Sequence, residues 1–219
     1  FCLRDYSFEN HKKTTEVHTD SVYGNTREGN ISIDNFHFYT KNIDIFTPKT
    51  QVTGFQTNKF YKERNVFFDK LKLIDSEITY VKNSSFGRSV ANKDTLGLLD
   101  HLFTKINGIE GNQLKIANTS VSAILPNSYH KLNHLDAELG DISITTTNRN
   151  DKDRILYSKQ VQIKFDNYNY VNERQLKHLK FTSFKASSID SLLEIKGFVY
   201  SPTLGEEEFL NNLRYRKTF

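Results

Sequence analysis

The chain has 219 residues, enough for one large domain or for a repeating unit and part of the next. Only 37% of the residues are apolar but Phe (17) and Tyr (11) are plentiful, which suits sheets with one apolar and one wet face. The 30 basic and 26 acidic residues form no dense basic run of the kind that binds nucleic acid, and a single cysteine, Cys2, excludes an internal disulfide and a cysteine-based metal site.

Alternation of apolar and polar residues predicts strands along most of the chain. The expected strands cover residues 14–23, 29–39, 50–56, 64–74, 76–82, 112–125, 134–146, 154–165, 175–186 and 190–200. Short connections rich in Asn, Asp, Gly and Ser separate them, which indicates an antiparallel meander. Residues 92–106 and 201–215 instead show the apolar spacing of short helices.

A short motif recurs inside four expected strands: apolar, polar, apolar, any residue, then Asn, Asp or Gly. It occupies residues 31–35, 71–75, 114–118 and 193–197. The apolar alternation changes phase directly after each motif, which predicts a β-bulge. Asn, Asp and Gly fit this interpretation because they tolerate positive φ. A sheet that bends at regular places forms a trough or a partly open barrel, so we expect an elongated, curved all-β groove.

Residues 5–40 match residues 167–202 without a gap, each pair lying 162 positions apart. Tyr6 falls on Tyr168 and Phe36 on Phe198, and the apolar positions stay in register through two strands and their turn. We therefore predict that residues 1–162, including a helix at 92–106, form one full repeat, and that residues 163–219 begin the next in the same continuous sheet. Repeat arrays more often present extended surfaces than single catalytic pockets.

The runs at 66–83, 111–124, 154–187 and 187–209 resemble repeat units of large envelope proteins of Bacteroidota, in the AsmA-like and TamB-like group. The resemblance covers nearly all of the chain and rests on hydrophobic patterns rather than on catalytic signatures. It implies a taco-shaped antiparallel sheet with an apolar concave face, as in bridge-like lipid-transfer proteins. It also implies a periplasmic protein anchored at the inner membrane, with a role in phospholipid movement and outer-membrane homeostasis. We expect any membrane anchor to lie upstream of Phe1.

The same alternation selects candidates for the apolar lining of the groove. They are Ile31, Ile33, Phe36, Phe38, Leu71, Leu73, Leu114, Ile116, Leu193, Ile195, Phe198 and Tyr200. Leaving such a face wet costs ~25 cal/mol per Å², so several hundred Å² amount to roughly 10 kcal/mol. Lipid acyl chains could cover it; alternatively, the sheet halves and helices close into a sandwich core.

No residue pattern indicates catalysis or a metal. His130, His134 and Asp136 lie in a segment expected to be a turn and a strand, where positions four apart are too distant to share one zinc ion. Asp151 and Asp153 lack the residue order of a calcium loop. There is no Gly-x-Ser-x-Gly elbow and no phosphate-binding glycine loop, so we expect neither an enzyme nor a cofactor.

These features predict a non-enzymatic envelope protein fragment whose groove binds or conducts lipid acyl chains. The alternative is a structural or adhesive β-repeat module that binds protein or glycan. A hydrolase-type β-sandwich is a third possibility, to be recognised by carboxylates that converge in a cleft.

Overall fold

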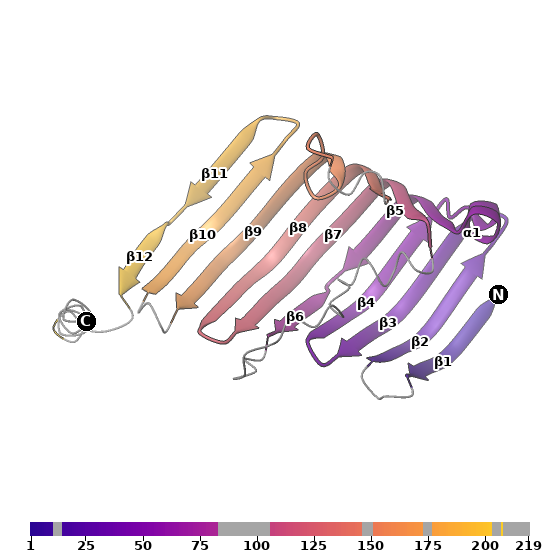
Figure 1. Cartoon of the computed structure of the whole chain (residues 1–219), viewed down its shortest axis with the longest axis horizontal. Coiled ribbons are helices and arrows are strands. Elements are labelled where there is room, and N and C mark those ends of the chain that lie inside the picture. The colour runs from indigo at the N-terminus through magenta and orange to yellow at the C-terminus, as the bar shows by residue number, and fades with distance from the viewer. Residues whose placement is uncertain (11–14, 83–105, 146–150, 173–176, 203–206, 208–219) are drawn as a thin grey trace, which may run out of the picture.

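The computed structural model describes residues 1–10, 15–82, 106–145, 151–172, 177–202 and 207. Within them the chain forms one mixed sheet of 12 strands and one short helix (Figure 1), which confirms the all-β class. The elements are β1 (Cys2–Glu9), β2 (Thr15–Asn25), β3 (Asn30–Thr40), β4 (Ile43–Thr53), α1 (Thr57–Glu63), β5 (Asn65–Ile74), β6 (Glu77–Val81), β7 (Gly108–Leu125), β8 (Ser128–Thr145), β9 (Ser158–Asn172), β10 (Lys177–Ser187), β11 (Leu192–Lys196) and β12 (Val199–Pro202).

The strands follow the order β1-β2-β3-β4-β5-β7-β8-β9-β10-β11. Two strands continue others end to end: β6 follows β5 between β4 and β7, and β12 follows β11 beside β10. All pairings are antiparallel except those of β5 and β6 with β7. β6 ends at Val81 and β7 begins at Gly108, a connection long enough for the parallel pairing, which a pure meander does not contain.

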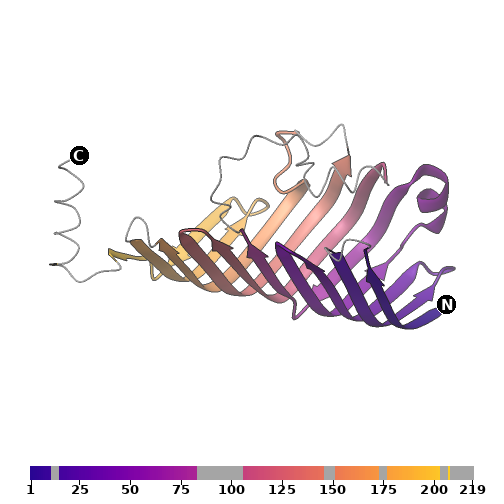
Figure 2. The same cartoon turned by 60° about the horizontal axis from the view of Figure 1, so that its bottom comes forward.

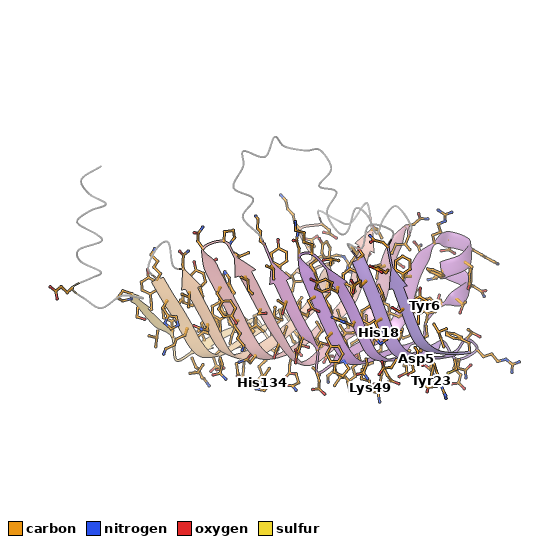
Figure 3. All side chains as sticks on the ribbon, turned by 90° about the horizontal axis from the view of Figure 1, so that it is seen from below. Asp5, Tyr6, His18, Tyr23, Lys49 and His134 are labelled. Carbon is orange, nitrogen blue, oxygen red and sulfur yellow. The ribbon has the colours of Figure 1, made fainter. Side chains whose placement is uncertain are left out.

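The sheet bends along one line that crosses its strands, and Figures 2 and 3 show the resulting open trough. Positive φ angles mark this line in most strands, at Asp5, Asn35, Asp75, Asn118, His134, Asn167 and Gly197. Positive φ is confirmed at all four predicted bulge positions, with 50° at Asn35, 54° at Asp75, 52° at Asn118 and 61° at Gly197. Among these four positions, the pairing register shifts only beside Asn118, between β7 and β8, whereas the pairings across Asn35, Asp75 and Gly197 keep their register. We call this row of residues the bulge line; it divides the concave face into a β5 half and a β6 half.

The best-buried part of the molecule lies in the β5 half, on the central strands. Phe68, Leu139, Ile142 and Val161 form its core, and their exposed fractions are 9% or less. Gly111 lies directly opposite Phe68 on β7, and a Cβ atom there would meet the Phe68 ring at 2.3 Å, so the glycine makes room for the ring. Described strands mainly contact their hydrogen-bonded neighbours, so the described sheet is a single layer and not a sandwich.

Several predicted elements differ from the observed ones. Helix α1 was not expected, because it buries no side chain and therefore has no apolar stripe that a sequence pattern could show. β4 begins at Ile43, earlier than the predicted start at 50, because Phe46 on the convex side interrupts the alternation. The predicted helix at 92–106 lies outside the described residues except for Ile106, which belongs to no element. The predicted helix at 201–215 begins with the last two residues of β12, and of the rest only Glu207 is described, in helical conformation.

The two similar segments have the same strand bounds. β2 and β10 match at both ends when 162 is added to each residue number, and β3 matches β11 together with β12. Their bulges match as well: Asp5 corresponds to Asn167, and Asn35 to Gly197. The segments therefore share backbone geometry in addition to hydrophobic pattern, while the division at residue 162 stays a prediction.

Candidate functional site

The concave face of the sheet, which we call the trough, is the candidate site. Lys49 and His134 project from its convex side (Figure 3). Because side chains alternate between the faces of a strand, the residues beside Lys49 and those in register with them point into the trough. One row of paired residues crosses the whole β5 half, and all but Thr50 are apolar. It consists of Leu3, Val22, Ile33, Thr50, Leu73, Ile116, Ala137, Ile163, Ala186 and Leu193.

A second apolar row runs through the β6 half. Its paired members are Phe8, Val17, Phe38, Ile45, Ile78, Val121 and Leu132. Without the bulges, these residues would lie on the convex face, because a slip of one residue exchanges the two faces of a strand. The bulge line therefore bends the sheet and also keeps its apolar face continuous across the bend.

Small hydroxyl residues occupy the inside of the bend. Thr47 lies on β4, Thr119 on β7 and Ser76 between β5 and β6, and they are 2%, 0% and 2% exposed, respectively. The Ser76 hydroxyl donates to Thr47 Oγ1 at 3.1 Å, whereas Thr119 Oγ1 has no hydrogen-bond partner among the described residues.

Side-chain amides and carboxylates hold the bulges together. Asn35 Nδ2 donates to Asp20 Oδ2 at 2.7 Å, and this hydrogen bond is the main cause that lowers the pKa of Asp20. Asn118 Nδ2 donates to Asp75 Oδ1 at 2.7 Å, and Asn118 Oδ1 lies 2.7 Å from His134 Nδ1. These polar groups are exposed, and they serve the bend without entering the trough.

The predicted lining residues can now be placed. Ile31, Ile33, Phe36, Phe38, Leu71, Leu73, Leu114, Ile116, Leu193, Ile195 and Tyr200 all occupy trough positions by register. Those on β3, β5 and β7 are partly buried. Those at the β11 and β12 edge are more open, from 47% exposed at Ile195 to 69% at Leu193. Phe198 lies between these two strands, directly after Gly197, and is 58% exposed.

An aromatic cluster on β9 and β10 was missed by the sequence reasoning. Phe165 stacks on Phe184 and Tyr168 on Phe181, each pair with ring centroids 4.7 Å apart. Burial raises the pKa of Tyr168, whose hydroxyl lies 2.9 Å from Nδ1 of His130. The repeat could have indicated where these four rings lie, because they correspond to Leu3, Val22, Tyr6 and Thr19 in the first segment.

The two histidines considered for a metal site lie on opposite faces of β8. His130 faces the trough, where its ring contacts Tyr170, and His134 lies on the convex side (Figure 3). Among the described residues, no group of three or more His, Cys, Asp or Glu side chains is arranged to hold a metal ion. No helix in the described part of the chain has the length and apolar character needed to span a membrane.

Comparisons with known proteins add no identification. No family model matches the sequence. No curated protein matches it either.

Proposed function

We propose that the trough binds lipid acyl chains and shields them from water. The observation that carries this proposal is the continuity of the apolar face, with one apolar row from β1 to β11 in the β5 half and another from β1 to β8 in the β6 half. Among the described elements, only α1 is not part of the sheet, and it buries none of its side chains. A long, open, apolar strip suits a flexible hydrocarbon chain better than a compact polar substrate.

The energetics support an apolar occupant. Monomeric soluble proteins rarely expose contiguous apolar patches larger than a few hundred Å². At ~25 cal/mol per Å², covering such a patch contributes roughly 10 kcal/mol before the cost of ordering the ligand. Because neither of the two apolar rows contains a charged residue, a lipid chain lying along them could also slide, which accords with a role in lipid transfer. The resemblance to AsmA-like and TamB-like proteins, and the periplasmic location that it implies, stay predictions.

Neighbouring aromatic residues on β3 provide a matched test. Phe38 lies in the trough between Val17 and Ile45, whereas Tyr39 lies on the convex side and is 43% exposed. We expect the purified protein to carry phospholipid, detected by mass spectrometry of an organic extract, and to bind a fluorescent fatty acid. Phe38→Asp should weaken binding of the fluorescent fatty acid at least ~10-fold because it places a charge against the hydrocarbon. Tyr39→Asp should leave binding unchanged.

A second trough variant guards against misfolding. Ile195 is 47% exposed at the sheet edge, so Ile195→Asp should fold normally and still weaken lipid binding. Circular dichroism and thermal unfolding would confirm that each variant is folded. A lipid-free wild-type protein that binds no fatty acid would overturn the proposal. Equal effects of Phe38→Asp and Tyr39→Asp would do the same, and would favour a structural or adhesive module.

A further inference from the structure

The trough is not apolar along its whole length: its β6 half ends in a polar group on β8, β9 and β10. Ser128, Asn172 and Lys177 form one row of paired residues there. The next row inward contains His130, Tyr170 and Leu179. Asn172 Nδ2 donates to the Tyr170 hydroxyl at 2.8 Å, which shows that the two rows share one face.

Three polar side chains of this group have atoms that remain available to bind a ligand. The Tyr170 hydroxyl oxygen already accepts from Asn172, so its proton is free to be donated outward. His130 uses Nδ1 to contact the Tyr168 hydroxyl, which leaves Nε2 without a hydrogen-bond partner among the described residues. Lys177 forms no ion pair with any other described residue. Lys177 lies diagonally across from Tyr170 on the neighbouring strand, a spacing that long side chains can bridge. An ammonium, a phenol hydroxyl and an imidazole on one face can together bind an oxyanion.

The polar group adjoins the most aromatic part of the trough. The His130 ring lies against Tyr170, with centroids 4.6 Å apart, and its Nδ1 contacts Tyr168. Tyr168 in turn stacks on Phe181 and begins the cluster that continues through Phe165 to Phe184. An anion at Tyr170 and Lys177 would therefore have an apolar platform directly beside it, which leads from the rim toward the bend.

We propose that this end of the trough is a headgroup site that binds a lipid-borne oxyanion, a carboxylate or a phosphate, while the attached acyl chain lies on the aromatic cluster. The inference rests on the proposed function, because it assigns a direction to the lipid in the trough, with its headgroup at this end. Tyr170 and Lys177 contact the headgroup, and His130 both contacts it and is positioned by Tyr168. A free anion would satisfy the donors but would leave the aromatic platform uncovered.

The test is displacement of a neutral fluorescent probe, N-phenyl-1-naphthylamine, by four compounds. Laurate and dodecyl phosphate carry both chain and anion, methyl laurate carries only the chain, and inorganic phosphate only the anion. The two lipid anions should bind about 10-fold more tightly than methyl laurate, equivalent to about 1.4 kcal/mol. Inorganic phosphate should neither displace the probe nor compete with laurate.

Variants test whether Tyr170 and Lys177 cause the preference for the lipid anions. Tyr170→Phe and Lys177→Gln should each remove most of the preference for laurate over methyl laurate, and leave the affinity for methyl laurate unchanged. The controls are Tyr129→Phe and Lys180→Gln, which make the same chemical changes on β8 and β10 but on the convex face, and should leave the preference intact.

The possible failures can be told apart. If methyl laurate and laurate both fail to displace the probe, the trough does not bind acyl chains and the proposed function fails. If both bind with equal affinity, or if the Tyr170 and Lys177 variants keep the preference, only the headgroup site is overturned. Inorganic phosphate that competes with laurate at micromolar concentration would assign the site to a free anion and also overturn it.

Discussion

At the scale of single residues, Thr119 is the clearest departure from ordinary protein interiors. It is 0% exposed, yet its hydroxyl has no hydrogen-bond partner within the described part of the chain. A buried, unpaired polar atom costs on the order of 1–3 kcal/mol. The bend requires a short side chain at this place, but it does not require that side chain to be polar.

We therefore predict that Thr119→Val raises the free energy of unfolding by about 1 kcal/mol, because it keeps the shape and removes the unpaired hydroxyl. Thr47→Val is the matched control. It makes the same change in the same bend, but it removes the acceptor of the Ser76 hydroxyl and should lower stability by about 1 kcal/mol. Urea unfolding measures both, and a loss of stability in Thr119→Val would contradict the interpretation.

At the scale of secondary-structure elements, the β-bulge determines both the curvature and the sidedness of the sheet. Asn118 shows how one bulge is held: its φ is 52°, its amide donates to Asp75, and its backbone N–H donates to Asp136 Oδ1 at 2.9 Å. A positive φ is costly for most side chains, above all for β-branched ones. The hydrogen bonds and the tolerance of Asn for this conformation offset that cost.

Two substitutions at Asn118 separate these contributions. Asn118→Gly loses the side-chain hydrogen bonds but accepts the positive φ, so we expect a loss of about 1 kcal/mol in the free energy of unfolding. Asn118→Val loses the same bonds and adds backbone strain, so its loss should reach about 3 kcal/mol. In denaturant unfolding, we expect the free energy of unfolding to decrease from the wild type to Asn118→Gly and again to Asn118→Val. A Val variant as stable as the Gly variant would show that the backbone relaxes out of the bulge.

The bulges also explain which elements could be predicted from the sequence. A phase change is a local pattern, so Asn35, Asp75, Asn118 and Gly197 could be recognised one strand at a time. The parallel pairing of β5 with β7 depends on how distant segments meet, and no local pattern encodes it. The polar group around Tyr170 and Lys177 was missed for the same reason, because its members come together only through the register of β9 and β10.

At the scale of the whole molecule, the sheet has two open edges. Among the described strands, β1 pairs only with β2, and both β11 and β12 pair only with β10. Apolar trough residues are exposed at both edges, with Phe8 at 48% and Leu193 at 69%. The strand that corresponds to β1 in the second segment is part of β9, and β9 is paired on both sides. The β1 backbone pattern is therefore compatible with a further strand on its free side.

Unpaired edges of this kind favour pairing with another chain. We predict that the protein associates edge to edge as its concentration rises, with its apolar faces aligned into a longer trough. Ser7→Lys together with Val199→Lys would place charges on the convex side of both edge strands, and should shift the protein toward monomer in sedimentation velocity. Gln51→Lys adds the same charge on the inner strand β4 and should leave association unchanged. A protein that stays monomeric over the whole concentration range, or one in which Gln51→Lys acts like the edge variants, would contradict edge pairing and leave the trough as a single-molecule surface.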